Sequence, residues 1–186
     1  MKNIILGVTG SIAAYKAADI AHQLYKDGFN DEVIMTEGAT KIITSLTFRT
    51  LTKNRVYTDV FEDDFPSEVK HISLAQKADL VLIAPATANC IGKIAGGIGD
   101  DMLTTTILAI KNKPVLIAPA MNTNMWENPI VQDNITKLKK YGYQFIDPKE
   151  GMLAEGSIGK GPLADVDEIV KTVESILDCM ANTKSI

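Results

Sequence analysis

The sequence predicts a three-layer α/β/α fold, a doubly wound parallel sheet of five to six strands with helices on both faces. Short apolar runs alternate with stretches of helical spacing along the chain. Each apolar run is almost entirely hydrophobic, which is typical of strands buried on both faces of a parallel sheet. The length of 186 residues suits one domain, and we expect residues 1–186 to form it.

The elements follow in order from these patterns. The apolar runs predict strands over 3–8, 32–36, 56–60 (a short edge strand), 80–84, 115–118 and 143–146. Helical spacing predicts helices over about 12–26, 69–77, 91–99, 101–110, 129–141 and 166–180, with one or two short helices within 38–51. The acidic segment 62–67 is expected to be an exposed loop. The segment 147–165 has four glycines, two prolines and no periodicity, so no helix or strand is predicted there.

Composition and charge argue against several classes of function. A net charge of −4 without a stripe of Lys or Arg argues against nucleic acid binding. Cys90 and Cys179 do not make a disulfide framework, and His22 and His71 supply no metal-binding cluster. The first apolar run is too short for a signal peptide or a membrane span. We therefore expect a cytoplasmic protein with no nucleic acid, membrane or metal partner.

The turn after the first strand, Gly10-Ser11-Ile12, offers backbone N–H groups, a hydroxyl and a helix N-terminus, which together suit a phosphate. It is not the G-x-G-x-x-G pattern, because Ala13 and Ala14 stand where further glycines are needed. One phosphate, as in a mononucleotide, therefore fits better than a pyrophosphate. The alternative is that the Gly-Ser turn only caps the helix.

Three loops, residues 9–12, 85–90 and 119–126, follow strands and are expected to meet at the carboxyl edge of the sheet, where open α/β sheets bind ligands. The third loop holds two Asn, two Met and the only Trp, which offer neutral polar groups beside an adaptable apolar wall. None of the loops offers a Ser-His-Asp set or an acidic metal cluster. The loops would thus orient an organic cofactor that carries the chemistry, unless the third is merely a turn capped by Asn.

In three motifs, which agree in order and spacing, the chain resembles the homo-oligomeric flavin-containing cysteine decarboxylases. The motifs are Gly10-Ser11-Ile12-Ala13, Pro85-Ala86-Thr87-Ala88-Asn89 and Pro119-Ala120-Met121-Asn122-Thr123-Asn124-Met125-Trp126. The resemblance covers about residues 3–176. It implies a Rossmann-like (flavodoxin-like) subunit that binds FMN and assembles into trimers or into dodecamers of trimers, with active sites near subunit contacts.

The resemblance also implies roles for individual residues. Gly10, Ser11 and Ile12 are expected to hold the FMN phosphate region, and the flavin is expected to be lined by Thr36, Thr87, Ala88, Asn89, Cys90 and Ala120. His71 matches the catalytic histidine, Asn122 matches the asparagine that binds the substrate carboxylate, and Met125 belongs to the same motif. The segment 147–165 resembles a mobile substrate clamp, in which Leu153 and Ala154 contact the substrate.

Decarboxylation of a cysteine adduct explains these residue types. Loss of CO₂ needs a place for an electron pair, and oxidation of the thiol to a thioaldehyde by flavin supplies one, so that an enethiolate forms. A histidine near the thiol suits the proton transfer, because its side chain titrates near neutrality. Asn122 fixes a carboxylate without adding a charge that would stabilise the ground state.

Two positions depart from the family pattern. Cys90 stands where the flavin loop of the family has a threonine. Glu155 stands where a cysteine normally follows Leu-Ala in the clamp and donates a proton during reduction of the enethiol. A carboxyl group donates a proton only when its pKa is raised, and when ionised it repels an enethiolate. We therefore expect oxidation and CO₂ loss to survive while the reductive half of the reaction is slow or absent.

The substrate class has three alternatives. The pattern Gly-x-Leu-Ala-x-Gly-x-x-Gly-x-Gly at 151–161 is similar to that of family members that decarboxylate phosphopantothenoylcysteine in coenzyme A biosynthesis. Glu155 instead favours the peptidyl-cysteine decarboxylases of lantibiotic type, which lack the clamp cysteine and stop at the enethiol. A non-catalytic flavin-binding regulatory subunit is the third alternative, against which His71 and Asn122 argue. We favour phosphopantothenoylcysteine.

Overall fold

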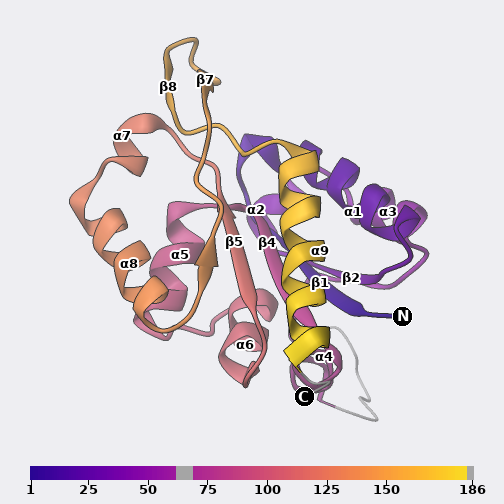
Figure 1. The fold of residues 1–186 in the computed structure, drawn as a ribbon. Helices are drawn as coiled ribbons and strands as arrows, with labels where there is room; N and C mark the ends of the chain where they lie inside the picture. Colours follow the sequence, from indigo (N-terminus) through magenta and orange to yellow (C-terminus); the bar gives the residue numbers. More distant parts are fainter. Residues whose placement is uncertain (62–68, 184–186) are drawn as a thin grey trace.

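The computed structural model describes residues 1–61 and 69–183, and its core is a parallel six-stranded sheet (Figure 1). The expected α/β/α fold with five to six parallel strands is confirmed. The predicted loop at 62–67 lies outside the described residues. The strands are β1 (Asn3–Val8), β2 (Asn30–Met35), β3 (Val56–Tyr57), β4 (Leu80–Ala86), β5 (Val115–Pro119) and β6 (Gln144–Phe145).

The strand order, β3-β2-β1-β4-β5-β6, is that of a Rossmann sheet. Without the two-residue edge strand β3, it is also the flavodoxin order. The chain winds outward from β1 to one edge and then returns to β4 beside β1. The crevice outside the carboxyl ends of β1 and β4 is therefore the switch point at which such sheets bind ligands.

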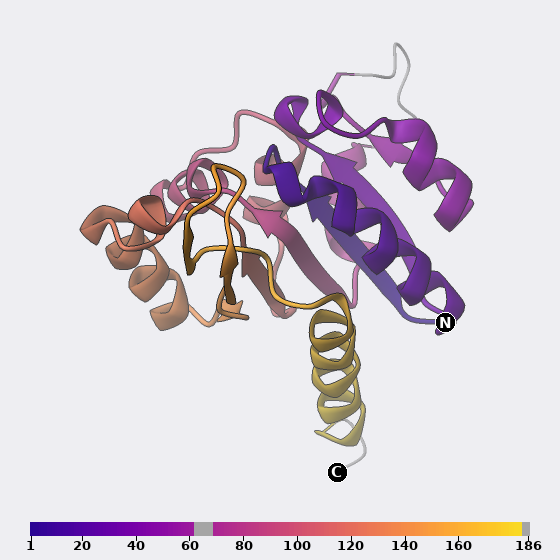
Figure 2. The same cartoon turned by 90° about the horizontal axis from the view of Figure 1, so that it is seen from above.

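Helices cover both faces of the sheet, as Figures 1 and 2 show. One face is covered by α1 (Lys16–Lys26), α3 (Ser45–Thr52) and α9 (Val166–Thr183), and the other by α4 (Lys70–Lys77), α5 (Ala88–Gly96), α6 (Met102–Ala109) and α8 (Pro129–Lys140). Shorter elements are the 3-10 helix η1 (Ile12–Tyr15), α2 (Glu37–Thr40) and α7 (Thr123–Trp126). Every described helix is too short or too polar to span a lipid bilayer.

The core forms two hydrophobic clusters, one on each face of the sheet. The wholly buried strand β4 shows why: Leu80, Leu82 and Ala84 pack into the cluster with α1 and α9, and Val81 and Ile83 into the cluster with α5 and α6. Successive side chains of a strand point to opposite faces, so a strand in the middle layer must be apolar at every position.

The strand predicted over 56–60 is shortened to β3 (Val56–Tyr57), and the helix predicted over 91–99 is α5, which begins and ends three residues earlier. At three further places the structure has an element that the sequence did not predict. The first predicted helix begins with η1, because Ser11 caps a tight 3-10 turn before the α-helical part. The loop after β5 contains α7, capped by Asn122. The segment 147–165, for which no strand was predicted, forms an antiparallel hairpin of β7 (Glu150–Met152) and β8 (Ile158–Lys160), which is called the β7–β8 hairpin below.

The β7–β8 hairpin stands above the carboxyl edge of the sheet (Figure 1). Its turn is closed by hydrogen bonds from Leu153 N to Ser157 O (2.8 Å) and from Gly156 N to Leu153 O (2.9 Å). Gly156 has a φ of 91°, which a side chain would strain. Three-residue strands with a central glycine show no alternation of hydrophobicity, so the hairpin could not be found from periodicity.

Candidate active site

The loops after β1, β4 and β5 are joined by hydrogen bonds at the switch point. The buried Thr9 hydroxyl donates to Pro85 O (2.7 Å) and accepts from Thr87 N (3.0 Å), which joins the first loop to the second. Ala120 N donates to Ala86 O (3.0 Å), which joins the second to the third. The three loops predicted to meet thus form one connected rim.

The first loop presents backbone N–H groups toward this rim. Ser11 caps η1, its hydroxyl accepting from Ala13 N at 3.3 Å. The N–H groups of Gly10 and Ile12 donate to no other group in the described part of the chain. A Cβ at Gly10 would lie 3.0 Å from the backbone of Gly38, so the close approach of α2 favours glycine there. The turn can therefore donate to an anion.

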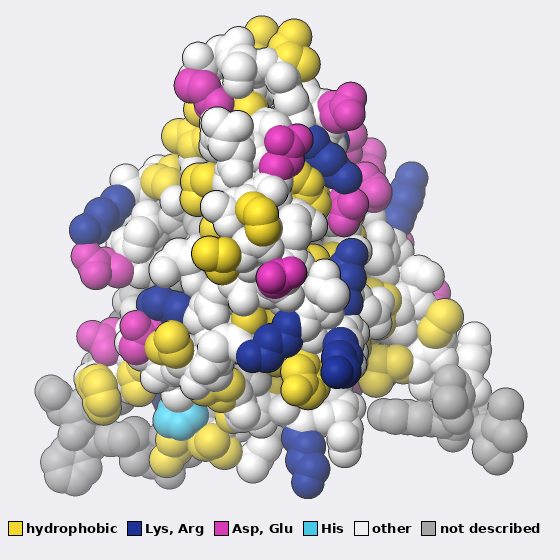
Figure 3. Space-filling model, turned by 90° about the vertical axis from the view of Figure 1, so that its left-hand side faces the viewer, with side chains coloured by type: hydrophobic (Ala, Val, Ile, Leu, Met, Phe, Trp, Pro, Cys, Tyr) yellow, Lys and Arg dark blue, Asp and Glu magenta, His cyan; other side chains and the backbone are white. Residues whose placement is uncertain are grey.

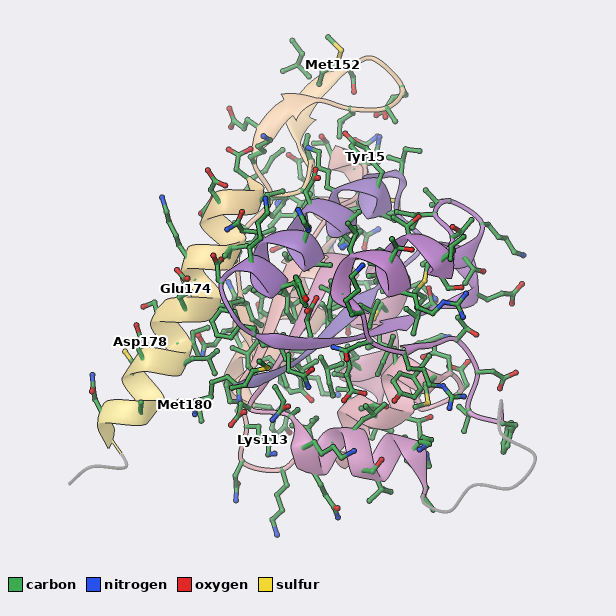
Figure 4. All side chains as sticks on the ribbon, turned by 90° about the vertical axis from the view of Figure 1, so that its right-hand side faces the viewer. Tyr15, Lys113, Met152, Glu174, Asp178 and Met180 are labelled. Atoms are coloured by element: carbon green, nitrogen blue, oxygen red, sulfur yellow. The ribbon has the colours of Figure 1, made fainter. Side chains whose placement is uncertain are left out.

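A cavity of about 560 Å³ opens between the three loops and the β7–β8 hairpin. It is lined by most of the predicted site residues: Gly10, Ser11, Ile12, Thr87, Ala88, Ala120, Asn122, Met125, Leu153, Ala154 and Glu155. Its volume lies in the usual range for small-molecule sites. Figure 4 labels two residues of its wall that belong to different elements, Tyr15 at the end of η1 and Met152 on the hairpin above it.

Three predicted flavin contacts, Thr36, Asn89 and Cys90, are not among the residues that line the cavity. Thr36 caps α2, its hydroxyl accepting from Ala39 N at 3.4 Å. Asn89 is exposed at the start of α5. Cys90 packs into the core, where burial raises the pKa of its thiol to about 12. Only the backbone of Cys90 reaches toward the loop, through a bond from its N–H to the Thr87 hydroxyl (3.2 Å).

His71 does not reach the cavity within one chain. It is the second residue of α4, which packs against α6. Figures 1 and 4 place α4 at the end of the molecule opposite the β7–β8 hairpin. Its half-buried imidazole is absent from the cavity lining. A site that uses His71 together with Asn122 therefore needs two copies of the chain.

Asn122 is oriented by its own helix. Its Oδ1 atom accepts from Asn124 N at 2.8 Å as the cap of α7, which leaves the Nδ2 group as the donor on the cavity side. That group donates to Glu155 Oε1. The Ser157 hydroxyl lies 3.1 Å from the same carboxylate oxygen and donates to it. The Glu155 carboxylate is therefore hydrogen-bonded to the amide that the sequence predicts to bind the substrate carboxylate.

The base of the β7–β8 hairpin is fixed against the third loop. Met121 N donates to Gly161 O at 3.0 Å, and a Cβ at Gly161 would overlap Met121 O. A Cβ at Gly159 would likewise overlap the Thr123 hydroxyl. The Lys160 ammonium lies 5.5 Å from the centre of the Trp126 ring, within cation–π range. Glycines are needed here because the hairpin and α7 are in close contact.

Sequence reasoning missed several residues of the wall, among them Tyr15, Lys16, Met152 and Pro162. Lys16 adds a positive charge close to the turn that presents free N–H groups. It follows Ile12 by four positions, and side chains at that spacing share one face of a helix, so a helical projection of the first loop could have found it. Met152 and Pro162 could not be found in this way because the hairpin was not predicted.

The donor set and the walls fit a phosphorylated aromatic cofactor. Free N–H groups and a lysine lie at one part of the cavity, and small residues such as Ala88 and Ala120 leave room for a flat ring beside Met121 and Met125. Among residues 1–61 and 69–183, no group of three or more His, Cys, Asp or Glu side chains is placed to bind a metal.

The sequence model of the Flavoprotein family matches residues 1–178. The chain belongs to the Flavoprotein family. This flavoprotein is 50% identical to the probable phosphopantothenoylcysteine decarboxylase of Streptococcus mutans, over 95% of this chain and 99% of that protein. It is 51% identical to the coenzyme A biosynthesis bifunctional protein CoaBC of Bacillus subtilis, over 93% of this chain. The match spans 42% of the length of that bifunctional relative.

Solved structures agree with the family assignment. A cysteine-to-serine mutant of PPC decarboxylase, complexed with pantothenoylaminoethenethiol, superposes on this flavoprotein with a TM-score of 0.86 at 32% identity, covering 95% of this chain and 98% of that one. The FMN-dependent cysteine decarboxylase SpaF gives a TM-score of 0.85 at 33% identity, covering 97% and 98%. The resemblance inferred from the three loop motifs is confirmed.

Proposed function

We propose that this flavoprotein is an FMN-dependent decarboxylase that acts on phosphopantothenoylcysteine in coenzyme A biosynthesis. The observation that carries the proposal is the meeting of the three motif-bearing loops around one cavity, with the Asn122 amide directed into it. The names of the relatives described above support the substrate class. The proposed location is the cytoplasm, in keeping with the coenzyme A biosynthesis role in the names of the relatives.

Different residues of this chain would bind the phosphate and the ring of FMN. The N–H groups of Gly10 and Ile12 and the Ser11 hydroxyl would hold the phosphate, beside Lys16. Thr87, Ala88 and Ala120 would bound the ring, with Thr36 and Asn89 at its margin. When bound, FMN supplies a two-electron acceptor for the substrate thiol, so that the carbon next to sulfur becomes the sink for the electron pair of the departing CO₂.

Asn122 would hold the carboxylate that is lost. Its Oδ1 atom is engaged by Asn124 N, so its amide presents a donor in a fixed direction. A neutral donor orients the carboxylate while avoiding the strong ground-state stabilisation that an Arg would give. Met125, Leu153 and Ala154 would exclude water from the substrate chain, since a dry site strengthens each polar contact within it.

The base would come from a second copy of the chain. His71 lies on α4, at the end of the molecule opposite the β7–β8 hairpin (Figure 1), and is absent from the cavity lining. Imidazole suits transfer of the thiol proton near neutral pH. The β7–β8 hairpin also exposes apolar side chains at the top of the molecule (Figure 3), where Met152 and Ile158 are 74% and 82% exposed. We propose a homo-oligomer, a trimer or a dodecamer of trimers, in which these surfaces are in contact.

Glu155 is expected to interrupt the second half of the reaction. Full conversion to phosphopantetheine requires return of two electrons and protonation of carbon, whereas loss of CO₂ alone leaves the enethiol. Glu155 takes the place of the proton-donating clamp cysteine, and its carboxylate is exposed and bound to Asn122. The proposed product is therefore mainly the enethiol.

A direct test uses the purified protein with phosphopantothenoylcysteine. A yellow chromophore with the mass of FMN, CO₂ release, and enethiol in excess over phosphopantetheine are the expected results. Glu155→Cys should restore phosphopantetheine formation, whereas Ser157→Cys, which places a thiol two residues away in the same turn, should not. A colourless protein that takes up no FMN would contradict the cofactor assignment, and efficient phosphopantetheine formation by the wild type would contradict the interruption.

A second candidate function is the oxidative decarboxylation of a peptide that ends in cysteine. The observation that favours it is Glu155 itself, because peptide-specific relatives lack the clamp cysteine. The likeness to the cysteine decarboxylase SpaF is compatible with it. Faster CO₂ release from a Cys-terminated peptide than from phosphopantothenoylcysteine, compared as kcat/KM, would favour this candidate. The opposite ratio would favour the coenzyme A substrate.

A further inference from the structure

We infer that Glu155 is an internal ligand of the substrate site: its carboxylate occupies the Asn122 amide in the ligand-free protein and must leave when the substrate carboxylate binds. The inference rests on the proposed function, in which Asn122 receives that carboxylate. It adds to that function a built-in competitor, carried on the β7–β8 hairpin, which acts against carboxylated ligands only.

The hydrogen bonds of Asn122 place the two carboxylates in competition. Oδ1 is taken by Asn124 N at 2.8 Å, so that Nδ2 is the part of the amide that can serve a ligand. Nδ2 already donates to Glu155 Oε1. Nδ2 carries two N–H donors, but two carboxylates bound to it would lie a few ångströms apart, where like charges repel each other, so that one carboxylate disfavours the other. A substrate carboxylate therefore replaces Glu155 rather than joining it.

The hairpin is built so that its tip can move while its base stays in place. At the base, Lys149 N donates to Pro162 O (2.9 Å), Gly161 N to Lys149 O (3.1 Å) and Met121 N to Gly161 O (3.0 Å). At the tip, residues 154–158 are exposed, and the Glu155 carboxylate crosses to Asn122 in the third loop. Release of Glu155 thus frees the tip without breaking the bonds of the base.

Replacement of Glu155 by the substrate carboxylate at Asn122 sets the order of the steps. Substrate binding displaces Glu155 from Asn122, because the carboxylate of the substrate takes the same donor. When that group leaves as CO₂, Asn122 loses its acceptor and Glu155 can return. Glu155 then again occupies the Asn122 amide, beside a product that no longer carries a carboxylate. Glu155 is a positioning residue in this scheme, since it acts through Asn122.

Matched unreactive analogues test the inference on the FMN-loaded protein. Phosphopantothenoylserine keeps the carboxylate and replaces the thiol by a hydroxyl, and phosphopantothenoylethanolamine lacks the carboxylate as well. Calorimetry should show that Glu155→Ala binds the serine analogue about fivefold more tightly than the wild type does, and the ethanolamine analogue within about twofold of it. Glu155→Gln should give a smaller gain, since its neutral amide competes less well.

A matched control and a second measurement separate a bound competitor from a merely nearby charge. Glu150→Ala removes a carboxylate at the base of the same hairpin, outside the cavity lining, and should change neither affinity. In ligand-free protein, hydrogen exchange at the bonded amides of Leu153 and Gly156 should accelerate in Glu155→Ala and in Asn122→Ala to the same extent. The double variant should show no further increase.

The experiments distinguish a failure of the internal ligand from a failure of the proposed function. The internal ligand would be overturned, with decarboxylation left intact, by any of three results. Glu155→Ala changes the affinity for both analogues equally, or changes neither affinity, or the hydrogen-exchange rates respond to neither single variant. A wild-type protein that binds neither analogue and releases no CO₂ from phosphopantothenoylcysteine would overturn the proposed function, and the internal ligand with it. Tighter binding of the serine analogue alone, together with equally accelerated hydrogen exchange in the two single variants, supports both the internal ligand and the proposed function.

Discussion

Asp31, on β2 at the end of the sheet away from the cavity, is an unusual residue of the core. Its side chain is 0% exposed, and neither carboxylate oxygen accepts a hydrogen bond within the described part of the chain. Burial raises the pKa of this carboxyl group from its ordinary value of 3.8 to about 7, against the smaller opposing effect of its backbone N–H. The folded protein therefore holds a proton there that the unfolded chain releases.

The buried Asp31 carboxyl group makes the free energy of unfolding depend on pH. Below about pH 4 both states are protonated, and between pH 4 and 7 the folded state alone keeps the proton, so this group makes the free energy of unfolding fall as the pH rises. Asp31→Asn cannot ionise. Its stability relative to wild type should therefore be greater at pH 8 than at pH 4 by about 2–4 kcal/mol, measured by urea unfolding. A difference that is independent of pH would contradict the assignment.

At the scale of single residues, the sequence predicted the parts of the site that belong to the loop motifs. Gly10, Ser11 and Asn122 line the cavity because loops that follow parallel strands meet at one edge. Cys90 shows the limit of such reasoning. The motif predicts that it is close to the flavin, but the rotation of α5 turns its side chain into the core. Helix rotation depends on packing, which a short motif does not contain.

At the scale of elements, prediction succeeded where burial is uniform. The strands β1, β4 and β5 are apolar except for Asn3 at the start of β1, because each lies in the middle layer. It failed at α7 and at the β7–β8 hairpin, which are short and are held by caps, glycines and contacts with each other. Contacts of this kind join segments that are distant in sequence, so they leave no periodic pattern of hydrophobic residues within either segment.

The contact between the hairpin and the third loop yields a prediction. Gly161→Ala introduces a methyl group against the Met121 carbonyl, so that β8 must move away from the cavity. We expect the KM for phosphopantothenoylcysteine to rise about tenfold, because overpacking of this kind costs roughly 1–3 kcal/mol.

Gly151→Ala is the matched control on the neighbouring strand. Its methyl group would lie 3.6 Å from Pro162 Cγ, an ordinary contact, so that KM should change by less than about twofold. Equal effects of the two substitutions, measured by steady-state kinetics, would show that the close approach of β8 does not shape the site.

At the scale of the whole molecule, the alternation of strands and helices predicted the layers, but the strand order required the structure. The sequence contains no local feature that places β4 beside β1, and that placement alone creates the switch point where the cavity lies. The position of His71 likewise becomes clear only in the folded chain. Its motif predicts catalysis, whereas the fold places its helix, α4, far from α7, which Asn122 caps (Figure 1).

A mixing experiment tests whether two chains build one site. His71→Asn and Asn122→Asp variants, each inactive alone, are co-expressed with different tags and purified as mixed oligomers. If His71 of one chain serves Asn122 of another, about a quarter of the sites in a random mixture carry both native residues, and CO₂ release should recover to about that fraction. Persistent inactivity of well-formed mixed oligomers would contradict a site that His71 and Asn122 of different chains share.

Trp126 has a consequence for how the molecule can be observed. It is the only tryptophan, it is buried beside α8, and the ammonium group of Lys160 in β8 lies 5.5 Å from its ring. Indole emission responds to the charges and polarity around the ring. The protein therefore contains a natural optical probe beneath one strand of the hairpin, and its intrinsic fluorescence can follow that strand in solution without any attached label.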